Sequence, residues 1–108
     1  MEKKYVYLMW VYEHECACGV IFDHFPTLDD LLKTTCMGTC RKDNKEYVYL
    51  YCTIKIAKVP LEKIFNRKLA DFDDYVVFSI YLETMEVDKF KRMLEEARMK
   101  CEEGGDHK

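Results

Sequence analysis

The chain has 108 residues, with 17 Lys or Arg against 20 Asp or Glu and a formal net charge of −3. This length excludes a multidomain enzyme, and the mild acidity disfavours direct nucleic-acid binding, which usually relies on a basic surface. The longest strongly apolar run, residues 6–12, is far shorter than the roughly 20 residues of a membrane-spanning helix. Because the N-terminal residues show no signal peptide, we expect a cytoplasmic protein.

The first third of the chain predicts a β-hairpin followed by a helix. Residues 4–12 are β-branched and aromatic without a Gly or Pro, and residues 16–22 form a second, shorter apolar run. Thr27 and Asp30 have the spacing of a helix start, and leucines follow at helical intervals. We therefore expect two strands and then a helix over residues 28–37.

The remaining two-thirds predict two more strands and a second helix. Residues 46–58 and 75–83 alternate between aliphatic and polar or aromatic side chains, which is typical of strands. Residues 61–65 predict one helical turn. The polar segments 41–45 and 66–74 predict loops. A single apolar stripe predicts a helix over residues 86–101.

The resulting order is β-β-α-β-β-α. We expect one α+β domain over residues 1–101, with residues 102–108 as a frayed tail. Each helix has one apolar stripe, so the simplest solution is a two-layer domain: a four-stranded, mostly antiparallel sheet with both helices on one face. This order resembles a circularly permuted ferredoxin-like sandwich, an analogy that carries no function.

Alternation within the strands predicts a tyrosine-rich face on the sheet. Successive side chains of a strand point to opposite faces, so the aliphatic set should face the helices and the tyrosines should face away. The first strand fits if Val6, Leu8 and Trp10 join the aliphatic side. Seven of the eight tyrosines, all but Tyr12, then share one face near Lys55: Tyr5, Tyr7, Tyr47, Tyr49, Tyr51, Tyr75 and Tyr81.

Two interpretations of this face are open. Tyrosine suits a half-exposed strand, so the face could simply be solvated, or it could be covered by the 66–74 loop or by a second copy of the chain. Alternatively, it binds another protein, since tyrosine is common in interface hot spots. If the face is a binding surface, the bound protein is either a second copy of the chain, which gives a homodimer, or a different partner.

The cysteines suggest an alternative function as a small structural zinc-binding domain. Cys16 and Cys18 are two residues apart, and Cys36 and Cys40 are four apart, so four thiolates could form a tetrahedral site. The spacing is not that of a zinc finger, and free cysteines are often simply buried. A thiol enzyme is disfavoured because neighbouring glutamates raise a thiol pKa. We therefore expect no enzyme and no cofactor other than this zinc alternative.

The favoured function is a small, non-enzymatic protein-binding module. Small acidic domains without catalytic groups are similar in kind to the inhibitors that phages and other mobile elements make against host defences, anti-CRISPR proteins among them. Such an inhibitor could mimic phosphates to block a nucleic-acid-binding host effector. The carboxylates available for that role are Asp29, Asp30, Asp71, Asp73 and Asp74.

Overall fold

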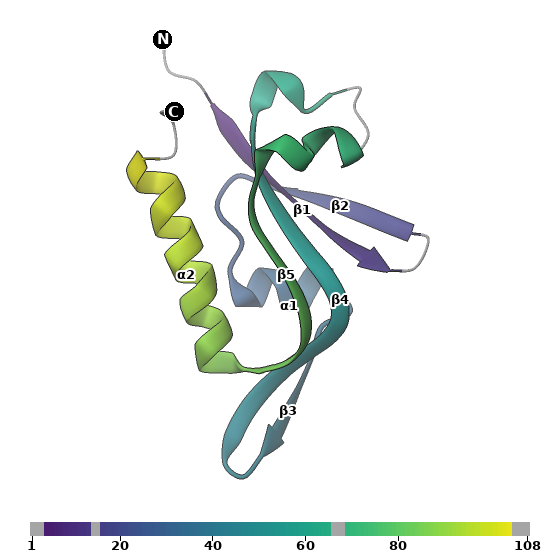
Figure 1. Cartoon of the computed structure of the whole chain (residues 1–108), viewed down its shortest axis with the longest axis vertical. Coiled ribbons are helices and arrows are strands. Elements are labelled where there is room, and N and C mark those ends of the chain that lie inside the picture. Colours follow the sequence, from purple (N-terminus) through teal and green to yellow (C-terminus); the bar gives the residue numbers. More distant parts are fainter. Residues whose placement is uncertain (1–3, 14–15, 66–68, 105–108) are drawn as a thin grey trace.

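The computed structural model describes residues 4–13, 16–65 and 69–104 (Figure 1). Within these ranges it confirms the predicted α+β class. The elements in chain order are β1 (Tyr5–Glu13), β2 (Cys16–Phe22), α1 (Leu28–Thr34), β3 (Gly38–Lys42), β4 (Lys45–Pro60), the 3-10 helices η1 (Leu61–Lys63) and η2 (Leu69–Tyr75), β5 (Val76–Glu86) and α2 (Val87–Gly104). None of the helices in the described ranges is long and apolar enough to cross a membrane.

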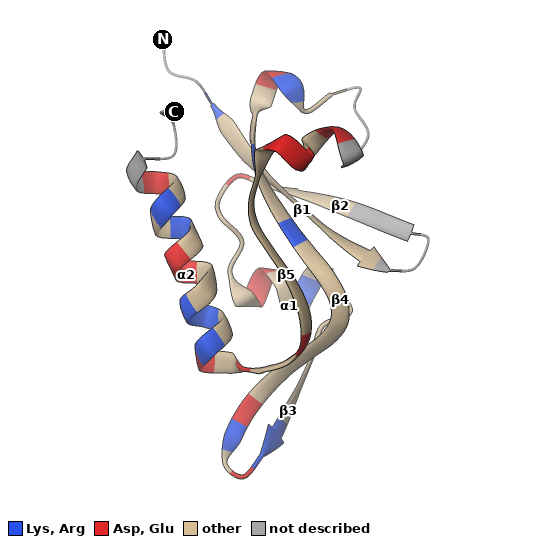
Figure 2. Cartoon of the chain, in the orientation of Figure 1, with Lys and Arg blue, Asp and Glu red and all other residues tan. Residues whose placement is uncertain are grey.

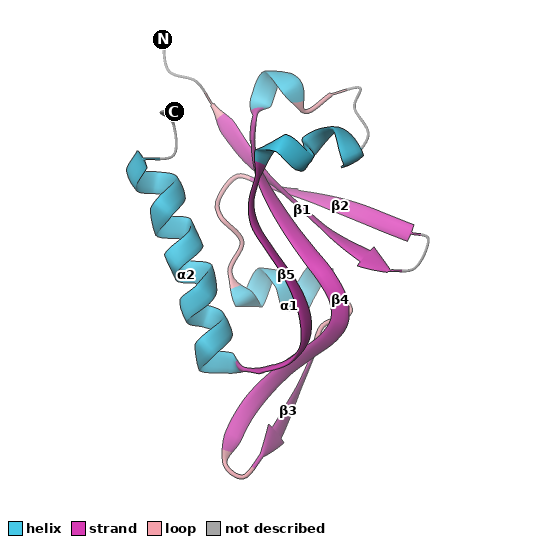
Figure 3. Cartoon of the chain, in the orientation of Figure 1, coloured by secondary structure: helices cyan, strands magenta, loops and turns pink. Residues whose placement is uncertain are grey.

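The long strand β4 organises an antiparallel, curled sheet (Figure 3). Along one edge, the C-terminal part of β4 pairs with β1 and its N-terminal part pairs with β3. Along the other edge β4 pairs with β5, and β2 extends the sheet beyond β1. Because β4 has 16 residues, it is long enough to carry two partners on the same edge.

The short strand β3 was not predicted: the expected helix ended at Met37, and residues 41–45 were expected to form a loop. Helix α1 instead ends at Thr34, because the following residue, Thr35, is extended and its hydroxyl donates to the carbonyl of Leu31. The turn from β3 to β4 consists of Asp43 and Asn44, both with positive φ. Two such residues form the tight turn whose twist matches a hairpin, and Asp and Asn tolerate this conformation.

Two hydrophobic cores lie on opposite faces of the sheet. The inner core fills the space between the sheet and both helices, and its fully buried members include Leu31, Ile54 and Phe90. The smaller outer core lies under η2, whose Phe72 is 2% exposed against Trp10. The two helices cover one face as predicted, and η2 in addition covers part of the other face of the sheet.

Strand β1 presents the opposite faces from those predicted. Tyr7 and Met9 point into the inner core, whereas Leu8 and Trp10 point into the outer core. The prediction was wrong here because both sides of β1 are apolar, so alternation alone cannot choose between them. The outer core accepts the larger side chain, Trp10, because Phe72 of η2 covers that side.

Candidate functional site

Five tyrosines line the part of the outer face that η2 leaves open. We call this group the outer tyrosine surface. Thr53 of β4 lies at its centre, paired with Tyr12 of β1 on one side and with Tyr81 of β5 on the other. The exposed fractions are 39% for Tyr49, 41% for Tyr12, 58% for Tyr81 and 60% for Tyr51. The surface consists of Tyr12, Tyr47, Tyr49, Tyr51 and Tyr81.

Tyr51 is held in a left-handed backbone conformation, with a φ of 62°. The pairing of β4 with β5 shifts register between Tyr49 and Cys52, which marks a β-bulge at this point. A side chain with a Cβ in this conformation costs about 1–2 kcal/mol. The Tyr51 side chain points outward, and its hydroxyl lies 3.5 Å from Oγ1 of Thr84.

Tyr49 packs against the backbone of the neighbouring strand β3. It pairs with Gly38, and a Cβ added at Gly38 would lie 2.5 Å from the Tyr49 ring. The missing side chain at Gly38 therefore lets the ring lie flat across the sheet. This contact orients Tyr49 within the outer tyrosine surface.

Two lysines near the surface are paired with carboxylates. Nζ of Lys55 lies 3.4 Å from Asp73 and 5.2 Å from the centre of the Tyr12 ring. Nζ of Lys45 lies 3.1 Å from Glu86, and this hydrogen bond raises the pKa of Lys45. These pairs reduce the positive charge available to a nucleic-acid phosphate. Lys42, opposite Lys45, is exposed and has no ion pair among the described residues.

Three of the seven predicted tyrosines lie elsewhere. Tyr7 is buried in the inner core, where desolvation raises the pKa of its hydroxyl. Tyr5 is half-buried, with Nζ of Lys58 4.7 Å from its ring centre, and Tyr75 packs against the outer core. Conversely, Tyr12 belongs to the surface although the prediction excluded it. The reversal of β1 explains the errors at Tyr5, Tyr7 and Tyr12, since Tyr12 lies two residues from Trp10 and therefore on the same face.

The five acidic residues do not form one patch. Helix α1 carries Asp29 and Asp30 on the inner side of the sheet, whereas η2 carries the other three on the outer side (Figure 2). Asp30 is also occupied, because it accepts hydrogen bonds from Thr27 and His24, and these lower its pKa. Asp73 pairs with Lys55. The sheet thus separates Asp29 and Asp30 from Asp71, Asp73 and Asp74.

The four cysteines of the zinc alternative are spread over the sheet. Pairing places Cys18 opposite Val11, which itself lies beside Ile54 of β4. Cys40 lies opposite Tyr47, at the other end of β4. The distance from position 47 to position 54 of an extended strand is on the order of 20 Å. The register therefore does not bring the two cysteine pairs together.

The cysteine side chains that are described lack a metal-binding arrangement. Cys36 and Cys40 are exposed, and the side chains of Cys16 and Cys18 lie outside the described residues. Among the described residues, no three His, Cys, Asp or Glu side chains gather as metal ligands. Burial raises the pKa of the Cys101 thiol, which keeps it protonated and unreactive.

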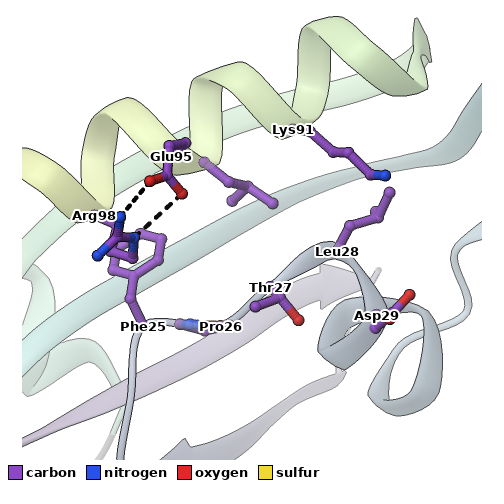
Figure 4. A pocket seen from close by; sticks show the side chains of 9 residues that line it. Phe25, Pro26, Thr27, Leu28, Asp29, Lys91, Glu95 and Arg98 are labelled. Atoms are coloured by element: carbon purple, nitrogen blue, oxygen red, sulfur yellow. Dashed lines mark hydrogen bonds and ion pairs between the residues drawn. The ribbon is translucent and has the colours of Figure 1, made fainter.

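A cleft of about 280 Å³ lies between the start of α1 and α2 (Figure 4). Its floor is apolar and includes Phe25, Leu28 and Leu94. At its rim, Arg98 is held by two glutamates of its own helix, and the hydroxyl of Thr27 is used to cap α1. Its described lining includes no His, Cys or Ser.

No protein-family model, curated protein or solved structure matches this chain. Its function must therefore be argued from the arrangement of its own residues.

Proposed function

We propose that this protein is a small, non-enzymatic module that binds another protein through the outer tyrosine surface. The observation that carries the proposal is Tyr51. A Gly or Asn would occupy its left-handed backbone position at lower cost. The chain instead places a large aromatic side chain there and leaves it 60% exposed. A local cost of this kind is typical of functional positions.

The neighbouring tyrosines support the same function. Tyrosine buries a large, rigid area at low entropic cost and still offers a hydrogen bond, which explains its frequency in hot spots. Thr53 and Thr84 add hydroxyls between the rings. The described face carries no residue pair suited to acid–base or nucleophilic chemistry, so binding is the activity that these groups support best.

A pull-down from the native host with two variants tests this function. Tyr81→Ala removes an exposed ring, and Tyr51→Asn removes another while suiting the left-handed backbone. We expect each to weaken partner capture by at least about thirtyfold, the effect of losing a hot-spot residue. Met99→Ala, an exposed apolar truncation on α2, is the matched control and should capture the partner normally.

The proposal fails if both tyrosine variants retain full capture while folded. Folding is checked by circular dichroism and thermal unfolding of each variant. Sedimentation of the purified chain decides whether the bound protein is a second copy, since a homodimer doubles the mass and Tyr81→Ala should then restore the monomer. Inhibition of a host nucleic-acid-binding effector, in the manner of anti-CRISPR proteins, remains a prediction. An enzymatic assay of that effector would test it.

A further inference from the structure

Strand β5 leaves a long edge of the sheet unpaired. Among the described strands it pairs with β4 alone, and no backbone hydrogen bond joins its other edge to another described segment. Helix α2 packs on the inner side of β5, where the Phe90 ring meets the Phe78 ring edge to face. A row of N–H and C=O groups without partners is a template for pairing with a further strand.

The side chains along this edge are apolar and incompletely covered. Residues 76–82 include no charged residue and no Pro, and Val77 and Tyr81 are 41% and 58% exposed. Phe78 and Ile80 face the inner core but are only partly buried. The edge strand β3, by contrast, has five residues and carries two exposed basic side chains. Charges and a short length protect an edge from pairing with other chains, and this part of β5 has neither protection.

Two register shifts limit the regular part of β5 to five residues. Its pairing with β4 is regular from Phe78 to Leu82 and shifts on either side of that stretch. If a second copy of β5 pairs antiparallel so that the two regular stretches coincide, Ile80 lies opposite Ile80 of the second copy. Phe78 then faces Leu82 on the inner side, and Ser79 faces Tyr81 on the outer side, each contact occurring twice because the pairing is symmetric. Apolar side chains therefore meet apolar ones, and a large ring meets a small side chain.

The charge along the strand is compatible with this symmetric pairing. Glu83 is the charged residue nearest the regular stretch, and it would lie opposite Val77 of the second copy. The two copies of Glu83 would then be six residues apart along the strands, roughly 20 Å. This separation exceeds the screening length of about 8 Å at physiological salt. No like charges face each other along the paired strands.

We propose that two copies of this chain associate through the free edge of β5, which pairs antiparallel with Ile80 at the two-fold axis. A second copy is the occupant that these observations favour, because its own β5 matches the regular stretch in length, apolar character and register. The pairing continues the sheet across both copies and covers Phe78 and Ile80. It also places Tyr81 of each copy at diagonal positions about 7–8 Å apart, which joins the two outer tyrosine surfaces into one. This inference goes beyond the proposed function and does not depend on it.

Two double variants that differ only at position 81 test the pairing and its register. Ser79→Glu with Tyr81→Glu places like charges opposite each other twice, whereas Ser79→Glu with Tyr81→Lys places opposite charges there. Both positions are exposed in the single chain, so both variants should fold, as circular dichroism checks. Sedimentation equilibrium should give a doubled mass for the unaltered chain and for the variant with opposite charges. The dimer of the like-charged variant should have a dissociation constant at least about tenfold higher.

A charge on the other open edge of the sheet is the control. Ile21→Lys changes a residue of β2 that is 56% exposed, and β2 pairs with β1 alone among the described strands. This variant should keep the doubled mass. A single-chain mass for the unaltered protein at about 100 µM, equal dissociation of the two double variants, or loss of the dimer in Ile21→Lys would each overturn the inference.

Tyr12→Ala separates this inference from the proposed function. Tyr12 belongs to the outer tyrosine surface but lies on β1, which β4 separates from β5. The variant should therefore remain dimeric. If it loses the doubled mass, self-association uses the outer tyrosine surface and this inference alone fails. If the chain dimerises as expected while Tyr51→Asn and Tyr81→Ala retain full capture of a partner, the proposed function alone fails.

Discussion

The two faces of the sheet are formed by the same strands, but one is covered by helices and the other is partly open. On the inner face, α1 and α2 cover the aliphatic side chains, and Ile54 and Ile56 are fully buried. On the outer face, η2 covers only part of the sheet, and the remainder presents tyrosines. The comparison shows that burial by helices makes the inner face the main source of stability. The incomplete cover of the outer face leaves a surface available for binding.

The largest effect should come from breaking the inner face. Phe90→Ala removes a fully buried ring of α2 that packs edge to face on Phe78. We expect a loss of about 4 kcal/mol in the free energy of unfolding, the cost of a Phe-to-Ala change in a core. Urea unfolding measures it. Tyr81→Ala on the open outer face is the comparison, and a similar loss there would contradict the division of roles.

A substitution in the covered part of the outer face should give the second-largest loss of stability. Phe72→Ala removes the main cover of the outer core, and we expect a cost of about 3 kcal/mol because that core is small. Trp10 is the only tryptophan of the chain and is fully buried there. Its fluorescence should therefore shift to longer wavelength in the folded variant. An unchanged emission spectrum would show that η2 is not what shields Trp10.

The contact between Gly38 and Tyr49 should give a smaller effect. Gly38→Ala places a methyl group against the far end of the Tyr49 ring, which is 39% exposed and can turn away, so the cost should be at most about 1 kcal/mol, the low end of overpacking. Adding Tyr49→Ala should restore most of that stability, since it removes the clashing atoms. A thermal-unfolding cycle of the two single variants and the double variant measures the coupling. Additive effects would mean that the ring does not lie over Gly38.

The bulge predicts a gain in stability. Tyr51→Asn replaces a residue that is costly in the left-handed conformation by one that tolerates it, so we expect the variant to be about 0.5–1 kcal/mol more stable. Tyr81→Asn, at a position without positive φ, is the matched control and should gain nothing. The same Tyr51→Asn protein should bind its partner less well, which would separate stability from function at one residue.

The smallest effect concerns pH and lies at the start of α1. His24 places one ring nitrogen 2.7 Å from Asp23 and the other 2.8 Å from Asp30. The hydrogen bond to Asp23, and then that to Asp30, raise its pKa above the ordinary value of 6.5. A protonated ring can donate to both carboxylates. The resulting stabilisation should be complete below pH 6.5 and disappear as the pH rises through the higher folded pKa.

Thermal unfolding across this pH range measures the effect. His24→Gln is the control, since it cannot acquire a proton. The variant should lose the pH dependence between 6.5 and the folded pKa of His24. If stability depends on pH equally in both proteins, the pH dependence comes from groups other than His24. The change should be small because His24 is exposed to solvent.

The candidate site was predictable only in part. The positions of Tyr47, Tyr49 and Tyr51 opposite the aliphatic residues of β4 followed from alternation, because only one side of that strand is apolar enough to be a core. The face that β1 presents did not follow. Both of its sides are apolar, so the choice depended on Phe72, a residue distant in sequence.

The amino-acid sequence by itself determined the types of four strands (β1, β2, β4 and β5), of both α-helices and of the turn η1, because hydrophobic periodicity acts over a few residues. The capping box of Thr27 and Asp30 likewise determined the start of α1. The tertiary structure alone decided that η2 covers part of the outer face, that β3 pairs with β4, and that Tyr51 sits at a β-bulge with a positive φ. These features depend on contacts between segments far apart in the chain. Their energies are absent from any local pattern.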